Sequence, residues 1–336
     1  MFLKINKRIV VLLSSCVVLT IIFIGVGTPV HAQNAGTSLQ NISYNITPEF
    51  PVPNTATTIR ISSVNVTLDT ATITWSLNGK TLLKGIGERS FPFVTGNIGI
   101  ASTIDITISP AKGSLIQKKI VITPIDVDLV WNANTYVHPF YKGKADYTYG
   151  SAVTVIALPA LSKTEDVLKQ SKNLIYKWSM NGGIMGDFSG YGKNSVTIPS
   201  SVLPLPITIG VDVRSSDGGI HSYKEIVLNP AQPKVLVYEN NPLYGIDYNT
   251  AVGNNYNLSS SEVTLSAVPY YFSIPTKDYP SLSYLWSINN QNFDSGDSSD
   301  VTFKQNGAGS SKVSVMLKNA IKTIQRSDKS FTISYQ

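Results

Sequence analysis

Apolar and polar residues alternate along most of the chain from Asn41 onward. Clear examples are 58–62, 71–77 and 104–108, in which every second residue is apolar. A period of two places the apolar side chains on one face of a β-strand. No stretch has the period of a long helix, and the polar segment 163–172 is expected to form a single turn or a loop. The pattern therefore predicts an all-β fold.

One strand pattern occurs three times. It reads ITWSLNG at 73–79, YKWSMNG at 176–182 and YLWSINN at 284–290. The tryptophans of the three copies are Trp75, Trp178 and Trp286, spaced by about the length of a small domain, which is typical of a tandem array. Each is flanked by alternating apolar residues, so we expect it to fill a domain core. The Asn-Gly pairs that end the first two copies favour the positive φ angles of a tight hairpin.

Each tryptophan strand lies among about seven short apolar runs separated by turn signals, as in a β-sandwich. Proline-bearing segments separate the copies, at Thr123-Pro124 and at 229–233 (NPAQP). We therefore predict three tandem domains, at 41–124, 125–230 and 233–336. Their linkers are short, so little freedom is expected between neighbours. The small polar residues 33–40 are expected to form a flexible leader.

The N-terminal segment 1–32 has the three-part plan of a secretory signal peptide. A basic start, an apolar run and a small-residue cleavage motif follow in order at Lys4, Lys7 and Arg8, at 9–26, and at Val30 and Ala32. The apolar run is also about as long as the roughly 17–25 residues that cross a bilayer, so an uncleaved N-terminal membrane anchor helix is the alternative. Either outcome predicts export, to the cell surface, the periplasm or the extracellular space.

Composition narrows the class of protein. The chain is 42% hydrophobic and 14% charged, which excludes a disordered or coiled-coil protein. Three of the basic residues behind the net charge of +6 lie in 1–32, and no Lys/Arg stripe follows, so no nucleic-acid partner is expected. Cys16 is the only cysteine, so the predicted domains contain no disulfide.

The repeated W-S-x-N strand resembles tandem bacterial immunoglobulin-like (Ig-like) and polycystic-kidney-disease-type β-sandwich repeats. The resemblance implies an all-β chain of three tandem Ig-like β-sandwich domains, with Trp75, Trp178 and Trp286 in their structural cores. The segments 48–54 (PEFPVPN) and 239–245 (ENNPLYG) are similar to uncharacterised exported proteins of candidate-phyla bacteria. That similarity implies a surface or envelope location and no established activity.

A second feature occurs only in the last two predicted domains. An aromatic residue ends the opening strand, and a Pro-x-Tyr follows in a loop, at 139–141 and 242–244. Flat amphipathic rings suit a glycan or a partner protein. The candidates are Trp131, Tyr136, Tyr141, Tyr238 and Tyr244. The alternative is that this loop packs over the junction with the preceding domain and stiffens the array, since the first domain lacks it.

No catalytic or cofactor-binding site is predicted. His138 and His221, the histidines that follow segment 1–32, belong to no metal-binding or nucleophile motif. Asp294, Asp297 and Asp300 form a Ca²⁺ candidate because oxygen-rich loops hold this ion, but EF-hand spacing is absent and a solvated turn is the alternative. The chain is therefore expected not to be an enzyme and to need no cofactor.

These observations favour a non-enzymatic protein of the envelope or cell surface that acts as a structural spacer or an adhesion module. The first alternative is a carbohydrate-binding module that uses the aromatic loop as a platform. The second is an accessory subunit of a pilus-like or secretion assembly. The expected partner is a surface protein or a glycan, and membrane contact is expected only through an uncleaved N-terminal segment.

Overall fold

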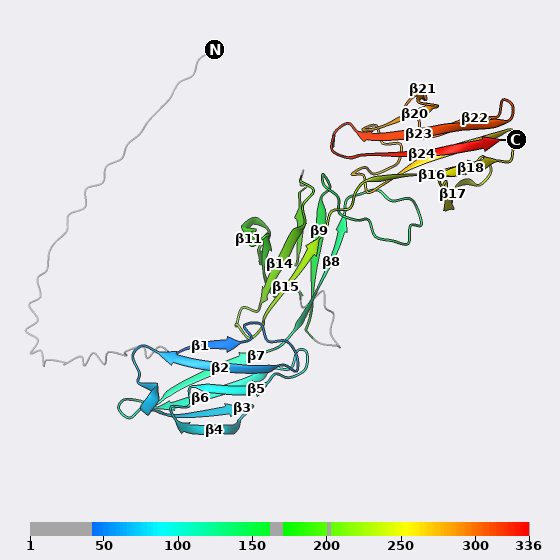
Figure 1. Cartoon of the computed structure of the whole chain (residues 1–336). Helices are drawn as coiled ribbons and strands as arrows, with labels where there is room; N and C mark the ends of the chain where they lie inside the picture. Colours follow the sequence, from blue (N-terminus) through cyan, green and yellow to red (C-terminus); the bar gives the residue numbers. More distant parts are fainter. Residues whose placement is uncertain (1–41, 162–170, 200–202, 336) are drawn as a thin grey trace, which may run out of the picture. The chain divides into compact units, whose positions relative to one another are not determined.

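The computed structural model describes residues 42–161, 171–199 and 203–335, which all belong to one unit of the chain, Gln40–Gln336. The segments predicted at 1–32 and 33–40, and most of 163–172, lie outside the described residues. The described residues are all-β, with six sheets that face each other in pairs, one pair for each tryptophan strand (Figure 1). No helix among them is long and apolar enough to span a bilayer.

The first sandwich pairs a three-stranded sheet with a four-stranded one. The smaller sheet, ordered β1-β2-β5, comprises β1 (Ile42–Thr47), β2 (Ala56–Ser63) and β5 (Ser90–Val94). The larger, ordered β4-β3-β6-β7, comprises β3 (Thr72–Leu77), β4 (Lys80–Ile86), β6 (Ser102–Ser109) and β7 (Ile116–Ile122). A 3-10 turn, η1 (Leu68–Thr70), leads into β3. In the core the Trp75 ring stacks on Phe91, with centroids 5.2 Å apart.

The second sandwich repeats this arrangement. Its smaller sheet, β13-β9-β8, comprises β8 (Asp126–Ala133), β9 (Val153–Ala160) and β13 (Ser195–Ile198). The other sheet is ordered β11-β10-β14-β15, with β12 also on β10, and comprises β10 (Ile175–Met180), β11 (Gly183–Ile184), β12 (Gly190–Tyr191), β14 (Ile207–Arg214) and β15 (His221–Leu228). A 3-10 turn, η2 (Gly186–Phe188), lies between β11 and β12. Gly218, with φ +75°, turns the β14–β15 hairpin, as the Asp-Gly-Gly sequence predicts.

The third sandwich has one sheet ordered β17-β16-β19-β22 and another ordered β18-β24-β23-β20-β21. The first comprises β16 (Lys234–Asn241), β17 (Gly245–Ala251), β19 (Glu262–Tyr270) and β22 (Asp300–Lys304). The second comprises β18 (Asn255–Leu258), β20 (Leu282–Ile288), β21 (Gln291–Asn292), β23 (Gly309–Asn319) and β24 (Arg326–Tyr335). Strand β18 pairs with β24 in parallel.

Each sandwich has its own core, and a tryptophan lies fully buried in each. The indole N–H always donates to a backbone carbonyl on the following loop. The bonds are Trp75 Nε1 to Glu88 O (2.8 Å), Trp178 Nε1 to Lys193 O (2.8 Å) and Trp286 Nε1 to Ser298 O (3.0 Å). Since a buried N–H needs a partner, this bond explains why the large indole fits a dry interior without an unpaired donor.

The asparagine of the repeated pattern does two things. Asn78, Asn181 and Asn289 adopt φ of 50°, 49° and 50°, the left-handed conformation that a two-residue type I′ hairpin requires. Each side-chain Oδ1 also accepts the backbone N–H of Thr103, Thr208 or Lys312, at 2.9, 2.9 and 3.0 Å. The asparagine therefore ties the hairpin to the strand that pairs on the other side of the tryptophan strand.

This double role predicts different costs for two substitutions at Asn181. Asn181→Gly keeps the positive φ and loses the bond to Thr208, which we expect to cost about 1 kcal/mol of unfolding free energy. Asn181→Ala loses the bond and also strains the backbone, so we expect about 2 kcal/mol. Urea unfolding followed by circular dichroism measures both. Equal costs for the two variants would contradict a turn role for this residue.

Candidate functional site at the β8–β9 loop

Loop 134–152 joins β8 to β9 of the second sandwich. Its base is closed by a hydrogen bond from Asn134 N to Ala152 O (2.8 Å), and within it Thr135 Oγ1 donates to Asp146 O (2.9 Å). Just before the loop, the half-buried Trp131 is covered by the Lys144 ammonium, 3.3 Å from the ring centroid. These contacts hold the loop as an arch with fixed ends.

The arch is hydrogen-bonded to the third sandwich through its backbone. Tyr136 N donates to Phe272 O (2.7 Å), and Tyr271 N donates to Tyr136 O (2.9 Å). The phenolic oxygens of Tyr141 and Tyr271 are 2.9 Å apart. Tyr271 has φ +62°, a conformation unfavourable for an aromatic residue, which its surroundings must hold in place. We call this set of contacts the clamp.

Gln325, which is fully buried, ties the far end of the loop to the third sandwich. Its Nε2 donates to Tyr149 O and to Ser273 Oγ, both at 2.9 Å, while its Oε1 accepts Ser273 N (2.9 Å) and Asn319 Nδ2 (3.2 Å). Ser273 Oγ donates in turn to Gly150 O (3.2 Å). One amide side chain therefore bridges three segments of the chain, and it belongs to the clamp.

A cluster of aromatic rings lies under the loop. His138 stacks on Tyr248, with centroids 4.2 Å apart and an interplanar angle of 8°, and meets Tyr141 and Tyr270 edge-on at 5.4 and 5.6 Å. The hydroxyl oxygens of Tyr238 and Tyr270 are hydrogen-bonded, 2.6 Å apart. The cluster rests on sheet β17-β16-β19-β22, with Val268 and Tyr271. The loop therefore covers an aromatic surface of the third sandwich.

Burial makes these tyrosines hard to ionise. It raises the pKa of Tyr136 to about 12, with smaller contributions from the nearby Tyr248 and Asp278. Burial also raises the pKa of Tyr238, Tyr248 and Tyr270. Each of these groups has a higher pKa in the folded chain than its unfolded value of about 10, so folding favours the neutral phenol.

The packing of loop 134–152 on these tyrosines should therefore weaken at high pH. The stability that the neutral phenols contribute is fully present below about pH 10 and is lost as the pH rises from there towards 12. Tyrosinate absorbance at 295 nm, recorded with circular dichroism, should show late-titrating tyrosines whose ionisation coincides with loss of structure. A Tyr136→Phe variant should lose part of that late absorbance. Ionisation of every tyrosine near pH 10 with the fold unchanged would contradict the burial of the cluster.

The connector between the first two sandwiches is also held from both sides. Thr123 N donates to Gly219 O of the second sandwich (2.7 Å), and Gly99 N of the first donates to Pro124 O (2.9 Å). Phe50 packs edge-on against His221 with centroids 4.6 Å apart and stacks on Tyr223 at 5.4 Å. The connector between the first two sandwiches therefore lies among specific contacts, like loop 134–152.

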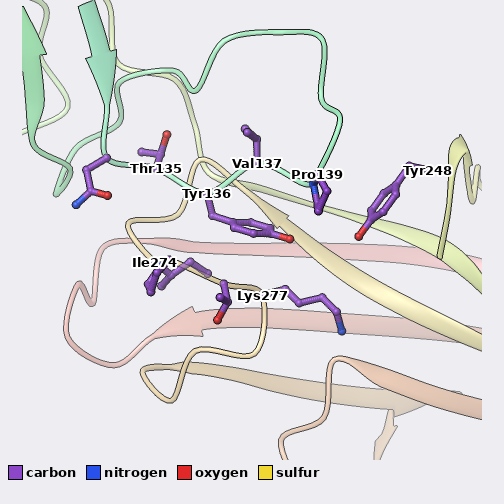
Figure 2. A pocket seen from close by; sticks show the side chains of 10 residues that line it. Thr135, Tyr136, Val137, Pro139, Tyr248, Ile274 and Lys277 are labelled. Atoms are coloured by element: carbon purple, nitrogen blue, oxygen red, sulfur yellow. The ribbon is translucent and has the colours of Figure 1, made fainter. Parts of the chain in front are cut away.

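Two hollows flank the loop and share Pro139 and Tyr248 in their walls. The first, of about 600 Å³, lies between the start of the loop and the segment after β19, with Tyr136 and Lys277 in its lining (Figure 2). The second, of about 970 Å³, lies between the loop and the β16–β17 hairpin. The second is the larger and carries the more exposed side chains.

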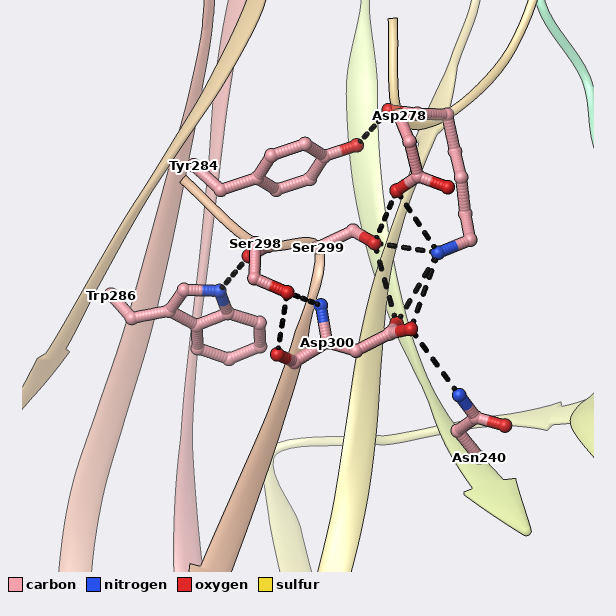
Figure 3. A network of polar contacts seen from close by, with 8 residues as sticks. Asn240, Asp278, Tyr284, Trp286, Ser298, Ser299 and Asp300 are labelled. Atoms are coloured by element: carbon pink, nitrogen blue, oxygen red, sulfur yellow. Dashed lines mark hydrogen bonds and ion pairs between the residues drawn. The ribbon is translucent and has the colours of Figure 1, made fainter. Parts of the chain in front are cut away.

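Lys277, which lines the first hollow, contacts the polar network of Asp278, Ser299 and Asp300 that Figure 3 shows. Its ammonium contacts Asp278 Oδ1 (3.2 Å), Asp300 Oδ1 (3.3 Å) and the Ser299 hydroxyl, while Asn240 Nδ2 approaches Asp300 Oδ2 (3.4 Å). A lysine thus supplies the positive charge beside Asp300.

The structure does not bring the Ca²⁺ candidates together. Asp300 faces Lys277, whereas Asp294 Oδ1 accepts Gly296 N (2.9 Å) within its own turn and Asp297 occupies a left-handed turn position with φ 54°. The described ranges contain no group of three or more His, Cys, Asp or Glu residues placed to hold a metal ion.

The five aromatic candidates from the sequence have different surroundings. Tyr238 is buried, Trp131, Tyr136 and Tyr141 are half-buried, and Tyr244 is 87% exposed. The two Pro-x-Tyr segments lie in different surroundings, since 139–141 is part of a long arch and 242–244 forms a hairpin tip. The prediction that the loop packs over the junction with the preceding domain is wrong for loop 134–152, because this loop lies on the following one.

Sequence patterns missed several residues of the clamp and of the aromatic cluster. Tyr248, Tyr270 and Tyr271 have no counterpart in the repeated pattern, and Gln325 is a single polar residue in a strand connection. The one available signal was the run of aromatic residues at 270–272, which departs from strict alternation at the end of β19. Both faces of that strand end are buried, which explains the departure.

No protein-family model matches the chain, and no curated protein matches it. Among solved structures it is similar to three N-terminal domains of the bacteriophage RB49 highly immunogenic outer capsid protein, with 10% identity over 88% of this chain and 98% of that one and a TM-score of 0.25. The central fibronectin-III array of RIM-binding protein has 10% identity, covers 88% and 97%, and has a TM-score of 0.31.

A Bacteroides ovatus glucan-utilization protein, SGBP-B, solved with a mixed-linkage heptasaccharide, has 11% identity over 88% of this chain and 71% of that one, with a TM-score of 0.22. These neighbours include tandem immunoglobulin and fibronectin-III domains. Identities and TM-scores this low carry no functional argument. The description of this chain as tandem Ig-like β-sandwiches rests on its own strand pairing and cores.

Proposed function

We propose that this chain is a non-enzymatic structural spacer with an adhesive role, built from Ig-like repeats of the bacterial or polycystic-kidney-disease type. The clamp is the observation that carries the proposal. A passive string of domains needs only a linker, whereas here loop 134–152 makes backbone, phenol and amide hydrogen bonds to the next sandwich. Such contacts restrict rotation between neighbours, which a spacer needs in order to hold its ends apart.

The distribution of histidines supports a non-enzymatic role. His138 is stacked on Tyr248, while His221 pairs with Asp212 at 3.3 Å in a different part of the fold, beside Phe50. Each ring therefore has a packing or hydrogen-bond partner that accounts for its presence. Neither lies beside a serine or cysteine placed as a nucleophile in the contacts of the described residues.

Small-angle X-ray scattering of the full chain tests the spacer role. We expect a distance distribution that one fixed arrangement of the three sandwiches reproduces. A Tyr136→Gly/Gln325→Ala double variant should require an ensemble of arrangements, because it lacks the Tyr136 ring that packs against the third core and the amide of the clamp. A wild-type curve that itself requires freely moving domains would overturn the proposal.

We also propose that the chain is exported, on the evidence of segment 1–32. Fractionation of the native cells with N-terminal sequencing tests this and separates a cleaved signal peptide from a retained anchor. Recovery of the intact chain from the cytosol would overturn it. Co-purification with a pilus-like or secretion assembly would instead favour the role of an accessory subunit.

A further inference from the structure

The larger hollow beside the clamp combines exposed rings with polar groups. Phe140 is 97% exposed and Tyr244 is 87% exposed, and both line it, one from the loop and one from the tip of the β16–β17 hairpin. Neither ring contributes to the clamp. Large aromatic side chains that are left in water at the rim of a cleft are typical of contact surfaces for a ligand.

The backbone of Phe140 strengthens this reading. Its φ is +63°, a left-handed conformation that is unusual for a bulky residue and costs free energy. Gly143 allows the loop to stay tight, because a Cβ there would lie 2.5 Å from the Tyr141 ring. The loop thus holds a strained turn whose visible result is a phenyl ring presented to solvent.

The polar groups of the hollow are already oriented. Glu239 Oε2 accepts the Tyr256 hydroxyl (2.9 Å), and Asp247 Oδ1 accepts both the backbone N–H and the Nδ2 of Asn249 (3.0 and 2.9 Å). Within the described part of the chain, the second oxygen of each carboxylate has no hydrogen-bond partner. Fixed acceptors beside flat rings match a molecule with hydroxyls on its edge and C–H groups on its face.

We propose that this hollow binds a neutral oligosaccharide. Phe140 and Tyr244 stack on the C–H faces of sugar rings, and Glu239, Asp247, Asn249 and Lys142 bond to hydroxyls. The charged lining has two carboxylates and one ammonium, which disfavours an acidic polysaccharide. The volume of about 970 Å³ has room for a short oligomer. The site deepens the adhesive part of the proposed function and does not depend on the stiffness of the clamp.

Isothermal titration calorimetry on the full chain tests the site with chitohexaose, cellohexaose, laminarihexaose and maltohexaose. We expect at least one of these to bind with a Kd of about 1 mM or tighter. Phe140→Ala and Tyr244→Ala should each weaken binding about tenfold. Tyr191→Ala, which removes a 62% exposed tyrosine of the second sandwich, is the matched control and should not change it.

Several outcomes would overturn the proposal. They are failure of all four sugars to bind, equal affinity of the two ring variants and the wild type, or binding only of hexagalacturonate or of a Lys-rich decapeptide, tested in parallel. The same variants should leave the scattering curve of the full chain unchanged. Loss of sugar binding with an unchanged scattering curve therefore separates this site from the spacer role. A wild-type scattering curve that requires freely moving domains would count against the spacer role alone.

Discussion

Trp178→Ala is expected to unfold the second sandwich at a temperature about 20 °C below its normal transition. The indole is fully buried in that core, and its removal leaves a cavity and deprives Lys193 O of its hydrogen-bond donor. Large-to-small changes of this kind cost about 4 kcal/mol, a substantial part of the roughly 5–15 kcal/mol that stabilise a domain. For a domain of about 100 residues, a loss of about 4 kcal/mol lowers the unfolding temperature by about 20 °C.

Differential scanning calorimetry gives the transition, and hydrogen exchange locates it. Strands β3 and β20 should keep their protection, because Trp75 and Trp286 lie in separate cores. Trp131→Ala is the control, since that ring is only half-buried and lies under Lys144, and it should cost about 1 kcal/mol. Equal losses of stability in the two variants would contradict the core role of Trp178, and joint unfolding of all three sandwiches would show that the separate cores are not independent.

Gln325→Ala is expected to release the loop while the sandwiches stay folded. The variant leaves Tyr149 O without its amide donor and Ser273 N without its amide acceptor. The Gln325 side chain that made both bonds is fully buried. Leaving such groups unpaired costs about 2 kcal/mol. The open form of the loop should therefore become roughly thirtyfold more populated.

Limited trypsin digestion reports this opening because Lys142 and Lys144 lie within the loop. Cleavage at these residues should be about thirtyfold faster in Gln325→Ala, since proteolysis tracks the population of the open form. Gln291→Ala, at an exposed position in the β20–β21 hairpin, should cleave at the wild-type rate. Identical rates in all three proteins would show that Gln325 does not hold the loop.

The sequence pattern predicts the sandwiches well because their strands depend on local alternation. Ile104, Ile106 and Ile108 are all buried on one face of β6, as the period of two requires. The Asn-Gly turns follow from backbone preference alone. Short edge strands such as β11, β12 and β21 were not predicted, because two residues carry no period.

The candidate site was harder to predict because it is made by contacts between distant segments. Tyr141 meets Tyr271 and Tyr149 meets Gln325 only after two sandwiches have formed, and no spacing in the sequence encodes those pairs. Tyr244 is among the candidates that the sequence suggests, whereas Phe140 is not and enters the sequence analysis only as the middle residue of the Pro-x-Tyr segment. Its exposure depends on a left-handed backbone angle that the sequence does not indicate.

The central claim is that the clamp fixes the second sandwich to the third. Pulsed dipolar spectroscopy measures this directly, with spin labels at Lys177→Cys and Lys318→Cys, both exposed positions, and with Cys16→Ser to remove the only native cysteine. The account predicts one narrow distance distribution that broadens when Gln325→Ala is added. A distribution that is already broad with Gln325 in place would contradict it.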